Sequence, residues 1–200
     1  MRAVVEHRIY LVRHGETAWS RTGQHTSRTD VPLTDRGREQ AIALGRWIGD
    51  RQFGLVLTSP RSRAAETAQL AGYGDAIPDP DLREWEYGDF EGRTSDEIRH
   101  EIPDWTIWGG PWRDGETARQ VARRADRVIS RCLAPSVDGD CVLFSHGHLL
   151  RVLTARWLGL PAGRGALFAL DTATIGVLGW EHDSRVVETW NESCDGELDP

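Results

Sequence analysis

The chain has 200 residues, a net charge of −7 with neutral histidines, and 39% hydrophobic and 28% charged residues. This composition is that of one ordinary globular domain. The negative charge argues against general nucleic-acid binding, which depends on neutralising phosphates. No apolar run approaches the roughly 18 residues that a membrane span needs, and the N-terminus lacks the apolar segment of a secretory signal. We therefore expect a cytoplasmic protein with no nucleic-acid or membrane partner.

The basic and sulfur-containing residues exclude several chemistries. All 24 Lys and Arg positions are arginine, which excludes a Walker-type phosphate loop and a Schiff-base mechanism, because both need a lysine amine. The three cysteines, Cys132, Cys141 and Cys194, are far apart and form no C-x-x-C pair. They predict neither a disulfide framework nor a zinc site, and none begins the C-x5-R signature of cysteine phosphatases. We expect no metal and no cofactor.

The first predicted strand, Ile9–Val12, ends at Arg13 and His14. In open α/β sheets, ligands bind just outside the carboxyl ends of strands. A neutral imidazole is a nucleophile, and an arginine is a bidentate clamp for phosphate oxygens. The same residues would also fit an exposed turn, so this position is a candidate site that needs partners elsewhere in the chain.

A polar stretch and two helix–strand units follow. Residues Thr17–Pro32 predict a long loop that either lines a polar pocket or lies in solvent. Thr34 caps a predicted helix that runs to about Gly49. The next strand, Gly54–Thr58, leads into a helix in which Arg61 is expected in the first turn. A cation there opposes the helix dipole, and either an anionic ligand or a nearby carboxylate would resolve the conflict.

The middle of the chain gathers carboxylates and aromatic residues. After a short edge strand or loop at Ala76–Pro80, the sequence D-L-R-E-W-E-Y-G-D-F-E-G holds five carboxylates in twelve residues. Burial among Trp and Tyr raises the pKa of a carboxyl group and favours a protonated acid, for which Glu84 is the candidate. The other four carboxylates are interpreted as surface or structural charges. The tryptophans between Ile102 and Gly115 indicate an aromatic lid or a packed corner.

The remaining elements predict the fold class. Thr94–His100 and Thr117–Ala134 predict helices, the second with an arginine-rich outer face. The strand Asp140–Phe144 ends at Ser145, His146, Gly147 and His148, so a second strand tip carries His-Gly. A helix at Leu149–Leu158 and strands at Ala166–Leu170, Ile175–Glu181 and Arg185–Trp190 follow. This alternation predicts an α/β fold, a three-layer α/β/α sandwich with a largely parallel central sheet, as a single domain over residues 1–190. Residues 191–200 are expected to be an acidic, frayed tail.

Taken together, these residues are the inventory for phosphoryl transfer without a metal. Arg13, Arg61 and His146 would hold the non-bridging oxygens of a phosphomonoester. His14 would attack phosphorus, and Glu84 would protonate the departing alkoxide and then activate water. The guanidinium charges would depress the pKa of His14 and keep it nucleophilic.

At this point the sequence resembles the histidine phosphatase superfamily, also called phosphoglycerate mutase-like. The motifs match in order over nearly the whole chain: R-H-G-E at residues 13–16, P-L-T-D-R-G-R-E-Q-A at 32–41, S-P-R at 59–61, Glu84 with Y-G-D-F-E-G, and S-H-G-H at 145–148. The resemblance implies a phosphoglycerate mutase-like fold, His14 as the nucleophile, Glu84 as the proton donor, and Arg13, Arg61 and His146 as phosphate ligands. Ser20 stands where many members have an asparagine that contacts phosphate.

Within the family, the segments around residues 22–34 and 82–92 look most like a phosphatase branch. That branch includes mycobacterial-type acid phosphatases and fungal sedoheptulose-1,7-bisphosphatases, and it implies hydrolysis of a small phosphorylated metabolite. The same resemblance makes Gln24, His25, Tyr87 and Arg151 candidates for contacting the rest of the substrate.

Other interpretations stay open at this stage. A dedicated sugar bisphosphatase would need an extra cation for the distal phosphate, from Arg93 or Arg151. A phosphoglycerate mutase is disfavoured, because the chain lacks the longer insertion and the lysine of cofactor-dependent mutases. A catalytically dead binding module is disfavoured because His14, Arg61 and Glu84 are present. A metal-dependent phosphatase is disfavoured because the acidic residues 138 and 140 precede their strand. The sequence leaves the substrate and any homo-oligomer undetermined.

Overall fold

The computed structural model describes residues 7–194, and its centre is a six-stranded mixed sheet in the order β3-β2-β4-β1-β5-β6. Strands β1, β2, β3 and β4 pair in parallel, while β5 and β6 join as an antiparallel extension beyond β1. This topology confirms the predicted α/β class with a largely parallel sheet. The strands are β1 Ile9–Arg13, β2 Leu55–Thr58, β3 Ile77–Pro78, β4 Cys141–Ser145, β5 Thr174–Glu181 and β6 Ser184–Ser193.

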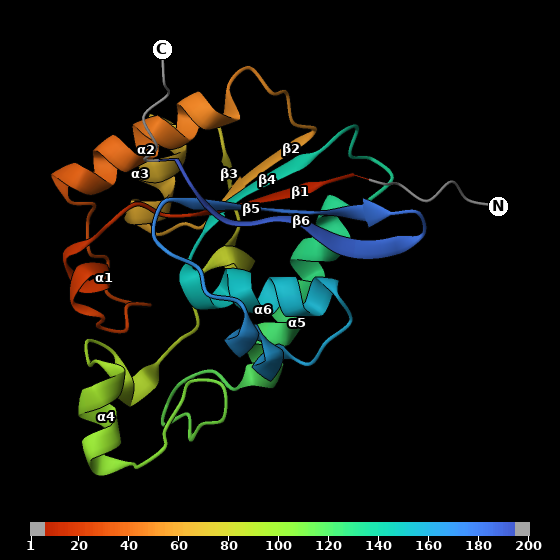
Figure 1. The fold of residues 1–200 in the computed structure, drawn as a ribbon. Helices are drawn as coiled ribbons and strands as arrows, with labels where there is room; N and C mark the ends of the chain where they lie inside the picture. Colours follow the sequence, from red (N-terminus) through yellow and green to blue (C-terminus); the bar gives the residue numbers. More distant parts are fainter. Residues whose placement is uncertain (1–6, 195–200) are drawn as a thin grey trace.

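Helices cover both faces of this sheet and form the outer layers (Figure 1). Helices α2 and α3 lie on one face, and α5 and α6 lie on the other (Figure 1). The α-helices are α1 Ala18–Thr22, α2 Asp35–Ile48, α3 Ser62–Leu70, α4 Ser95–Glu101, α5 Ala118–Cys132 and α6 Gly147–Trp157. Short 3-10 helices are η1 Pro80–Leu82, η2 Gly88–Phe90 and η3 Ala162–Leu167.

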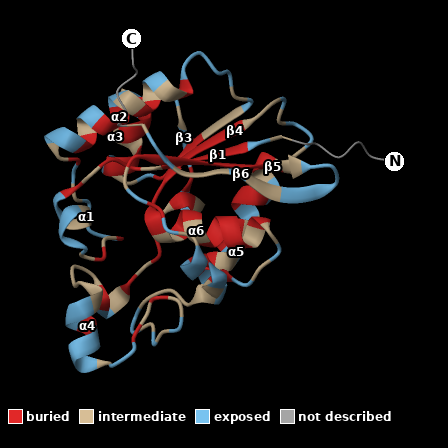
Figure 2. Cartoon of the chain, in the orientation of Figure 1, coloured by how far each residue is buried: buried red, intermediate tan, exposed pale blue. Residues whose placement is uncertain are grey.

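The central strand β1 divides the core into two parts. Ile9 and Leu11 pack with the α5 and α6 side, whereas Tyr10 and Val12 pack with the α2 and α3 side. Successive side chains of a strand point to opposite faces, so a strand buried on both faces is apolar throughout, as in Ile9–Val12. Figure 2 shows the result: the central strands β1 and β4 are buried between the helices, while the edge strand β6 is more exposed.

Local sequence explains where most helices begin. Thr34, Thr94 and Thr117 are N-caps whose side chains accept a backbone N–H of the following turn. Such caps contribute about 0.5–2 kcal/mol each. Helix α5 buries its regularly spaced Val121, Ala125, Val128 and Cys132, as its period predicts, but it also buries Arg124. The expectation that its arginines form an outer face therefore fails at Arg124.

Three boundary expectations are corrected. The apolar run Ala166–Leu170 is not a strand, because side chains take the backbone carbonyls that a strand would offer to its neighbour: Arg151 binds Gly165 and Ala166, Trp190 binds Ala169, and Arg13 binds Leu170. Strand β6 continues to Ser193, beyond the predicted domain end at residue 190, because it pairs with β5 as far as Thr174. Helix α1 lies inside the predicted loop. Residues 195–200 of the expected tail lie outside the described residues.

The tryptophan-rich corner is packed rather than a free lid. Trp105 is fully buried, and Trp108 and Trp112 pack against the core beside Trp85. The loop at residues 17–32 is also anchored, since the Glu91 carboxylate accepts the backbone N–H groups of residues 27 and 29.

The first turn of α2 touches the segment that follows β1, which makes Gly37 a test of the packing. A Cβ at Gly37 would collide with the backbone carbonyl oxygen of Glu16. Alanine is normally preferred to glycine inside a helix by about 1 kcal/mol, so the sign of the effect is diagnostic. We expect Gly37→Ala to lower the free energy of unfolding by about 1–3 kcal/mol, the usual cost of overpacking. Urea denaturation measures it. Gly74→Ala, whose new Cβ would have its nearest neighbour 4.0 Å away, is the control, and equal losses in the two variants would contradict the packing argument.

Candidate active site

Two histidines meet at the carboxyl ends of neighbouring strands. Strands β1 and β4 are parallel and in register, with Arg13 opposite Ser145, so the residues that follow them lie side by side. The rings of His14 and His146 have centroids 5.2 Å apart at an interplanar angle of 64°. The sequence motifs at the two strand tips are thus brought together by strand pairing alone.

Hydrogen bonding defines which nitrogen of His14 is available. Its Nδ1 lies 2.8 Å from the carbonyl oxygen of Gly15. Because a carbonyl only accepts, Nδ1 carries the proton, and the lone pair of the neutral ring is on Nε2. Burial, and then the positive charges of Arg63 and Arg13, hold the pKa of His14 well below 6.5. His14 is therefore neutral at neutral pH, and the lone pair on its Nε2 is available.

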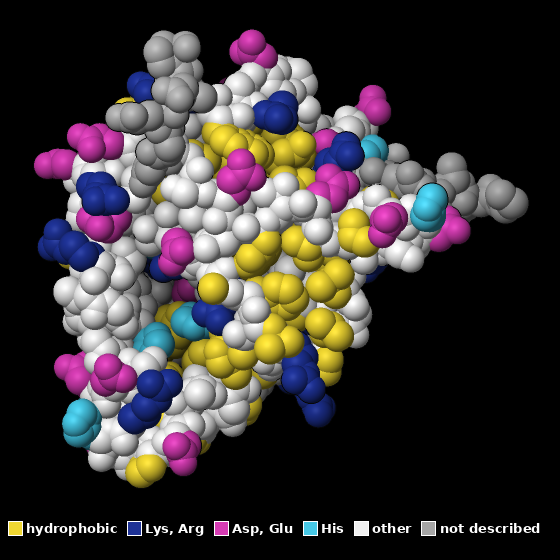
Figure 3. Space-filling model, in the orientation of Figure 1, with side chains coloured by type: hydrophobic (Ala, Val, Ile, Leu, Met, Phe, Trp, Pro, Cys, Tyr) yellow, Lys and Arg dark blue, Asp and Glu magenta, His cyan; other side chains and the backbone are white. Residues whose placement is uncertain are grey.

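Around the two histidines, several buried side chains each keep one nitrogen without a hydrogen-bond partner. Among the described residues, buried side-chain nitrogens without a hydrogen bond belong to Arg13, Arg61, Arg63, Arg131 and His146. Three of them, Arg13, Arg61 and Arg63, carry charges that lower the pKa of His14 or His146. A buried unpaired donor costs free energy, and clustered cationic donors are suited to an anion such as phosphate. Figure 3 shows histidine and arginine side chains together at a hollow on this face.

Arg63 is the residue that the sequence analysis missed. It is fully buried at the start of α3, and its two terminal nitrogens donate to the carbonyls of Thr29 and Thr26, 3.2 and 3.1 Å away. Its Nε has no partner, and its charge is the one that most lowers the pKa of His14 and of His146. The available signal was a second arginine two residues after Arg61.

The argument for Arg61 from the helix dipole is corrected. Helix α3 begins at Ser62, so Arg61 is its N-cap and not a member of its first turn. The Asp30 carboxylate accepts from the Ser62 backbone N–H and hydroxyl at 3.0 and 2.9 Å. The nearby carboxylate, rather than a ligand, thus satisfies this helix terminus. Arg61 does not line the cavity into which His14 opens, although its Nε is buried without a partner.

Glu84 lies at the N-terminus of α6. Its Oε1 accepts from the backbone N–H groups of Trp85 and Leu149, both at 2.9 Å, and its Oε2 accepts from that of His148 at 3.0 Å. Helix α6 has no side-chain cap from its own N-cap residue, so Glu84 serves this purpose from a distant segment. The remaining acceptor capacity is on Oε2.

A cavity of about 260 Å³ opens in front of these groups. His14, Arg13 and Glu84 line it, together with Ser20, which stands at the position of the phosphate-contacting asparagine. The four residues that the resemblance implied for the rest of the substrate also line it, namely Gln24, His25, Tyr87 and Arg151. His146 is fully buried and does not line the cavity, and its Nε2 lies 2.8 Å from Ser59 Oγ.

Three of the lining side chains are already engaged within the protein. The Ser20 hydroxyl donates to the Thr17 carbonyl at 3.0 Å, and the Gln24 amide donates to the Gly92 carbonyl at 2.8 Å. His25 stacks on Tyr87 with ring centroids 4.6 Å apart. These contacts hold the three side chains in place in the wall of the cavity.

Tyr87, which is buried, and His148, which is partly exposed, form a hydrogen-bonded pair that lines the cavity. The Tyr87 hydroxyl and His148 Nδ1 are 2.7 Å apart. Burial raises the pKa of Tyr87 well above 10, and burial, then the charges of His25 and Arg151, lower that of His148 well below 6.5. Both groups are therefore neutral at neutral pH. His148 itself was not predicted as a site residue, although it is part of the S-H-G-H motif.

Arg151 lines the cavity and is held there by two hydrogen bonds and an aromatic ring. Its Nε and Nη2 donate to the carbonyls of Gly165 and Ala166 at 3.1 and 3.3 Å, and its guanidinium lies 4.6 Å from the Trp108 ring centroid. Burial and then the like charge of Arg13 lower the pKa of Arg151. Two guanidinium groups that repel each other across one cavity favour an anion between them.

Comparison with known proteins identifies the family. Residues 9–193 match the family model of the histidine phosphatase superfamily (branch 1). The chain belongs to the histidine phosphatase superfamily. It is 43% identical to an acid phosphatase of Mycobacterium tuberculosis over 184 residues, which cover 91% of each chain. It is 36% identical to sedoheptulose 1,7-bisphosphatase of Saccharomyces cerevisiae over 76% of this chain and 68% of the yeast protein.

A solved structure agrees with the fold. The structure of an open reading frame product of Mycobacterium tuberculosis superimposes with a TM-score of 0.90 and 41% identity, over 94% of this chain and 98% of that one. The family membership and the phosphatase activity predicted from the motifs are confirmed. In the described part of the chain, no helix is long and apolar enough to cross a membrane. The same residues contain no group of three or more His, Cys, Asp or Glu side chains arranged to hold a metal ion.

The buried histidines predict how stability depends on pH. Burial lowers the pKa of His25 to about 4 and those of His14, His146 and His148 well below 6.5. In the unfolded chain, histidine titrates near 6.5. Below that pH the unfolded state binds protons that the folded state excludes, so the free energy of unfolding falls as the pH drops from about 6.5 toward 4. Above about 6.5 both states are neutral and the contribution is constant.

Urea denaturation between about pH 7 and pH 4.5 measures this dependence. His25→Gln should reduce the fall, because it removes one group that must stay neutral in the folded state. His100→Gln, at an exposed position on α4, is the matched control. A free energy of unfolding that is flat over this range, or equal slopes in the two variants, would contradict the buried neutral state of these histidines.

Proposed function

We propose that the protein is a metal-independent phosphomonoesterase that hydrolyses small phosphorylated metabolites through a phosphohistidine on His14. The observation that carries this proposal is the His14 ring, neutral, with its free lone pair on Nε2, beside arginines whose buried N–H groups lack partners. In the first step, Nε2 attacks phosphorus and forms a P–N bond while the bond to the ester oxygen breaks. In the second step, water attacks phosphorus, releases inorganic phosphate and restores His14.

Glu84 supplies the proton in the first step and removes one in the second. Its Oε2 has acceptor capacity left after the bond from His148, so this oxygen carries the proton to the departing alkoxide. The carboxylate that remains then takes a proton from the attacking water. Its position at the start of α6 keeps it in the cavity with His14.

Arginine side chains provide the positive charge that stabilises the transition state. Arg13 and Arg63 present unpaired Nε donors near His14, and Arg61 contributes charge on the side of His146. His146 Nε2 lies 2.8 Å from Ser59 Oγ, and its Nδ1 has no partner. In the proposal, the Ser59 hydroxyl donates to Nε2 and His146 carries its proton on Nδ1. Losing one such donor typically costs about 10²–10³ in rate.

A dedicated sugar bisphosphatase is the second candidate, and Arg151 is the observation that favours it. It lines the cavity that His14 and Arg13 line, where a second phosphate would relieve the repulsion between the two guanidinium groups. The similarity to the yeast sedoheptulose 1,7-bisphosphatase supports this candidate. Both candidates share the phosphohistidine chemistry and differ only in what Arg151 binds.

The chemistry is tested by two variants and two leaving groups. His14→Ala should abolish turnover and labelling of the phosphoenzyme, because it removes the nucleophile. Glu84→Gln should slow an alkyl phosphate by about 10²–10⁴ and p-nitrophenyl phosphate much less, since p-nitrophenolate leaves without a proton. Steady-state and quenched-flow assays in excess EDTA measure both.

Two outcomes would contradict this mechanism. Turnover that disappears in EDTA and returns with Mg²⁺ or Zn²⁺ would overturn the metal-independent reaction. Equal losses of Glu84→Gln on the two substrates would overturn the role of Glu84 as the acid.

Arg151→Ala separates the two candidate functions. For a sugar bisphosphate we expect kcat/KM to fall by the equivalent of about 1.5–3 kcal/mol, the contribution of a hydrogen bond to a charged group. Hydrolysis of p-nitrophenyl phosphate should barely change. Arg164→Ala, an exposed arginine on the neighbouring η3, is the control. Equal losses on both substrates would assign Arg151 to the phosphate pocket or the fold, and no loss on either would remove the case for a bisphosphatase.

A further inference from the structure

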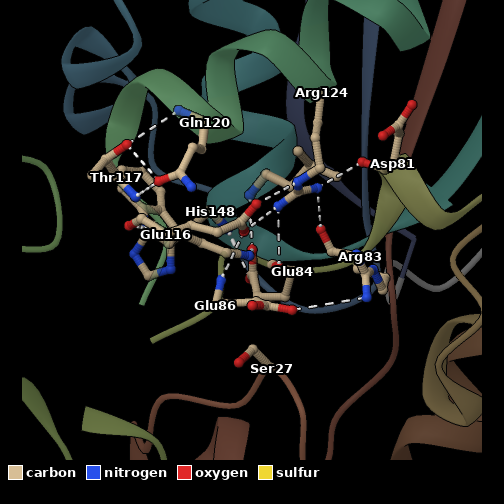
Figure 4. A network of polar contacts seen from close by, with 12 residues as sticks. Ser27, Asp81, Arg83, Glu84, Glu86, Glu116, Thr117, Gln120, Arg124 and His148 are labelled. Carbon is tan, nitrogen blue, oxygen red and sulfur yellow. Dashed lines mark hydrogen bonds and ion pairs between the residues drawn. The ribbon is translucent and has the colours of Figure 1, made fainter. Parts of the chain in front are cut away.

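Arg124 reaches from the middle of α5 to the segment that carries Glu84 (Figure 4). Its Nε and Nη2 donate to the two carboxylate oxygens of Glu116 at 2.8 and 2.6 Å. Its Nη1 donates to the carbonyls of Asp81 and Arg83 at 2.7 and 2.9 Å, and Nη2 also donates to that of Glu84 at 3.4 Å. A guanidinium has five N–H donors, so these contacts occupy all of them.

Glu116 holds the same segment on the other side of Glu84. Its Oε2 accepts from the backbone N–H of Glu86 at 3.1 Å, and its own N–H donates to the Glu86 carbonyl at 2.9 Å. Its carbonyl accepts from the Trp85 indole at 2.7 Å. The Arg124–Glu116 pair therefore fixes the backbone both before and after Glu84.

The segment needs such external contacts because it has no regular structure of its own. Residues 83–87 lie between η1 and η2 and belong to no helix or strand. Buried backbone carbonyls require hydrogen-bond partners. Two carbonyls of this segment, those of Arg83 and Glu84, find a partner in the Arg124 side chain, which also binds that of Asp81 in η1. Arg124 is only 6% exposed, and a buried ion pair is weak evidence for a contribution to stability. Its contacts are better explained by the conformation that they impose.

We propose that Arg124, together with Glu116, is a positioning residue that fixes the Glu84 carboxyl group at the N-terminus of α6. This inference rests on the proposed role of Glu84 as proton donor. Of the residues that line the substrate cavity, Arg124 binds Glu84, through the backbone carbonyl of that residue. The Glu84 carboxylate in turn accepts hydrogen bonds from the first turn of α6. Its effect on the reaction must therefore pass through the proton-transfer step.

The experiment compares the wild type, Arg124→Lys, Glu84→Gln and the double variant, on p-nitrophenyl phosphate and on glycerol phosphate. Lysine keeps the charge but has one nitrogen, so it cannot bind three carbonyls and a carboxylate at once. We expect Arg124→Lys to lower kcat for glycerol phosphate by about 10- to 100-fold, as displacing a catalytic group by about 1 Å does. The fall in kcat for p-nitrophenyl phosphate should stay within about twofold. When Glu84 is already glutamine, adding Arg124→Lys should lower kcat for glycerol phosphate by no more than about twofold further.

Arg156→Lys is the matched control, because Arg156 of α6 binds Asp126 of α5 through two hydrogen bonds, at 2.9 and 3.2 Å, away from the Glu84 segment. It should leave both rates unchanged. Thermal unfolding of each variant reports whether it folds. If Arg124→Lys does not fold, Glu116→Gln replaces it, since that variant keeps the three carbonyl contacts of Arg124 and loses one carboxylate oxygen. The same selective loss is expected.

The outcomes separate the inference from the proposed function. The inference would be overturned if Arg124→Lys lowered kcat equally for the two substrates. It would also be overturned if Arg124→Lys lowered kcat by the same factor in the wild type and in the Glu84→Gln variant. Either result would leave Arg124 with a structural role. If Glu84→Gln itself slows both substrates equally, the proton-donor role fails. The double variant then decides the positioning role: it supports that role if it loses no more than Glu84→Gln alone, and overturns it otherwise.

Discussion

The arrangement of this active site depends on cationic side chains that are buried around a neutral histidine. Some of their N–H groups have protein partners and others have none. Taking a guanidinium out of water is costly unless its charge and donors are matched. Here Arg13 and Arg63 satisfy some of their donors with backbone carbonyls and leave Nε unpaired. The two hydrophobic cores on either side of the sheet supply the favourable free energy that lets the fold tolerate this deficit. In the proposed reaction a bound phosphate would accept from unpaired donors of this kind, and the same feature would give both affinity for phosphate and stabilisation of its transfer.

The two halves of the proposed reaction depend on different kinds of structure. The nucleophile His14 follows a central parallel strand, where ladder hydrogen bonds and buried apolar side chains fix the backbone. The proton donor Glu84 lies on an irregular segment, whose position depends on side chains from α5 and on the N-terminus of α6. Sheet geometry thus positions the nucleophile, while a network of buried polar contacts positions the acid. Such a network specifies one conformation only when its members are all satisfied, as the five donors of Arg124 are.

Particular residues show how far the sequence could be interpreted. His14 and His146 were predicted to meet because both follow short apolar runs, and parallel strands bring their carboxyl ends to one edge of the sheet. Glu84 was chosen among five carboxylates for its aromatic neighbours, and the structure does bury it, at 5% exposed. The prediction for Arg61 depended on where a helix begins, which local signals determine only to within a few residues. The helix starts at Ser62. The charge that most lowers the pKa of His14 is then that of Arg63 and not that of Arg61.

The sequence by itself determined the alternation of strands and helices, the two His-Gly strand tips and the family. These depend on local periodicity and on short motifs, which are readable along the chain. Tertiary structure alone decided three things: the burial of Arg63 under the carbonyls of the loop at residues 26–29, the capping of α6 by Glu84, and the clamp of Arg124 on the segment at 81–86. In each case a side chain binds backbone groups 34 to 65 residues away. Every residue offers the same backbone groups, so no pattern in the sequence marks which of them a distant side chain will bind.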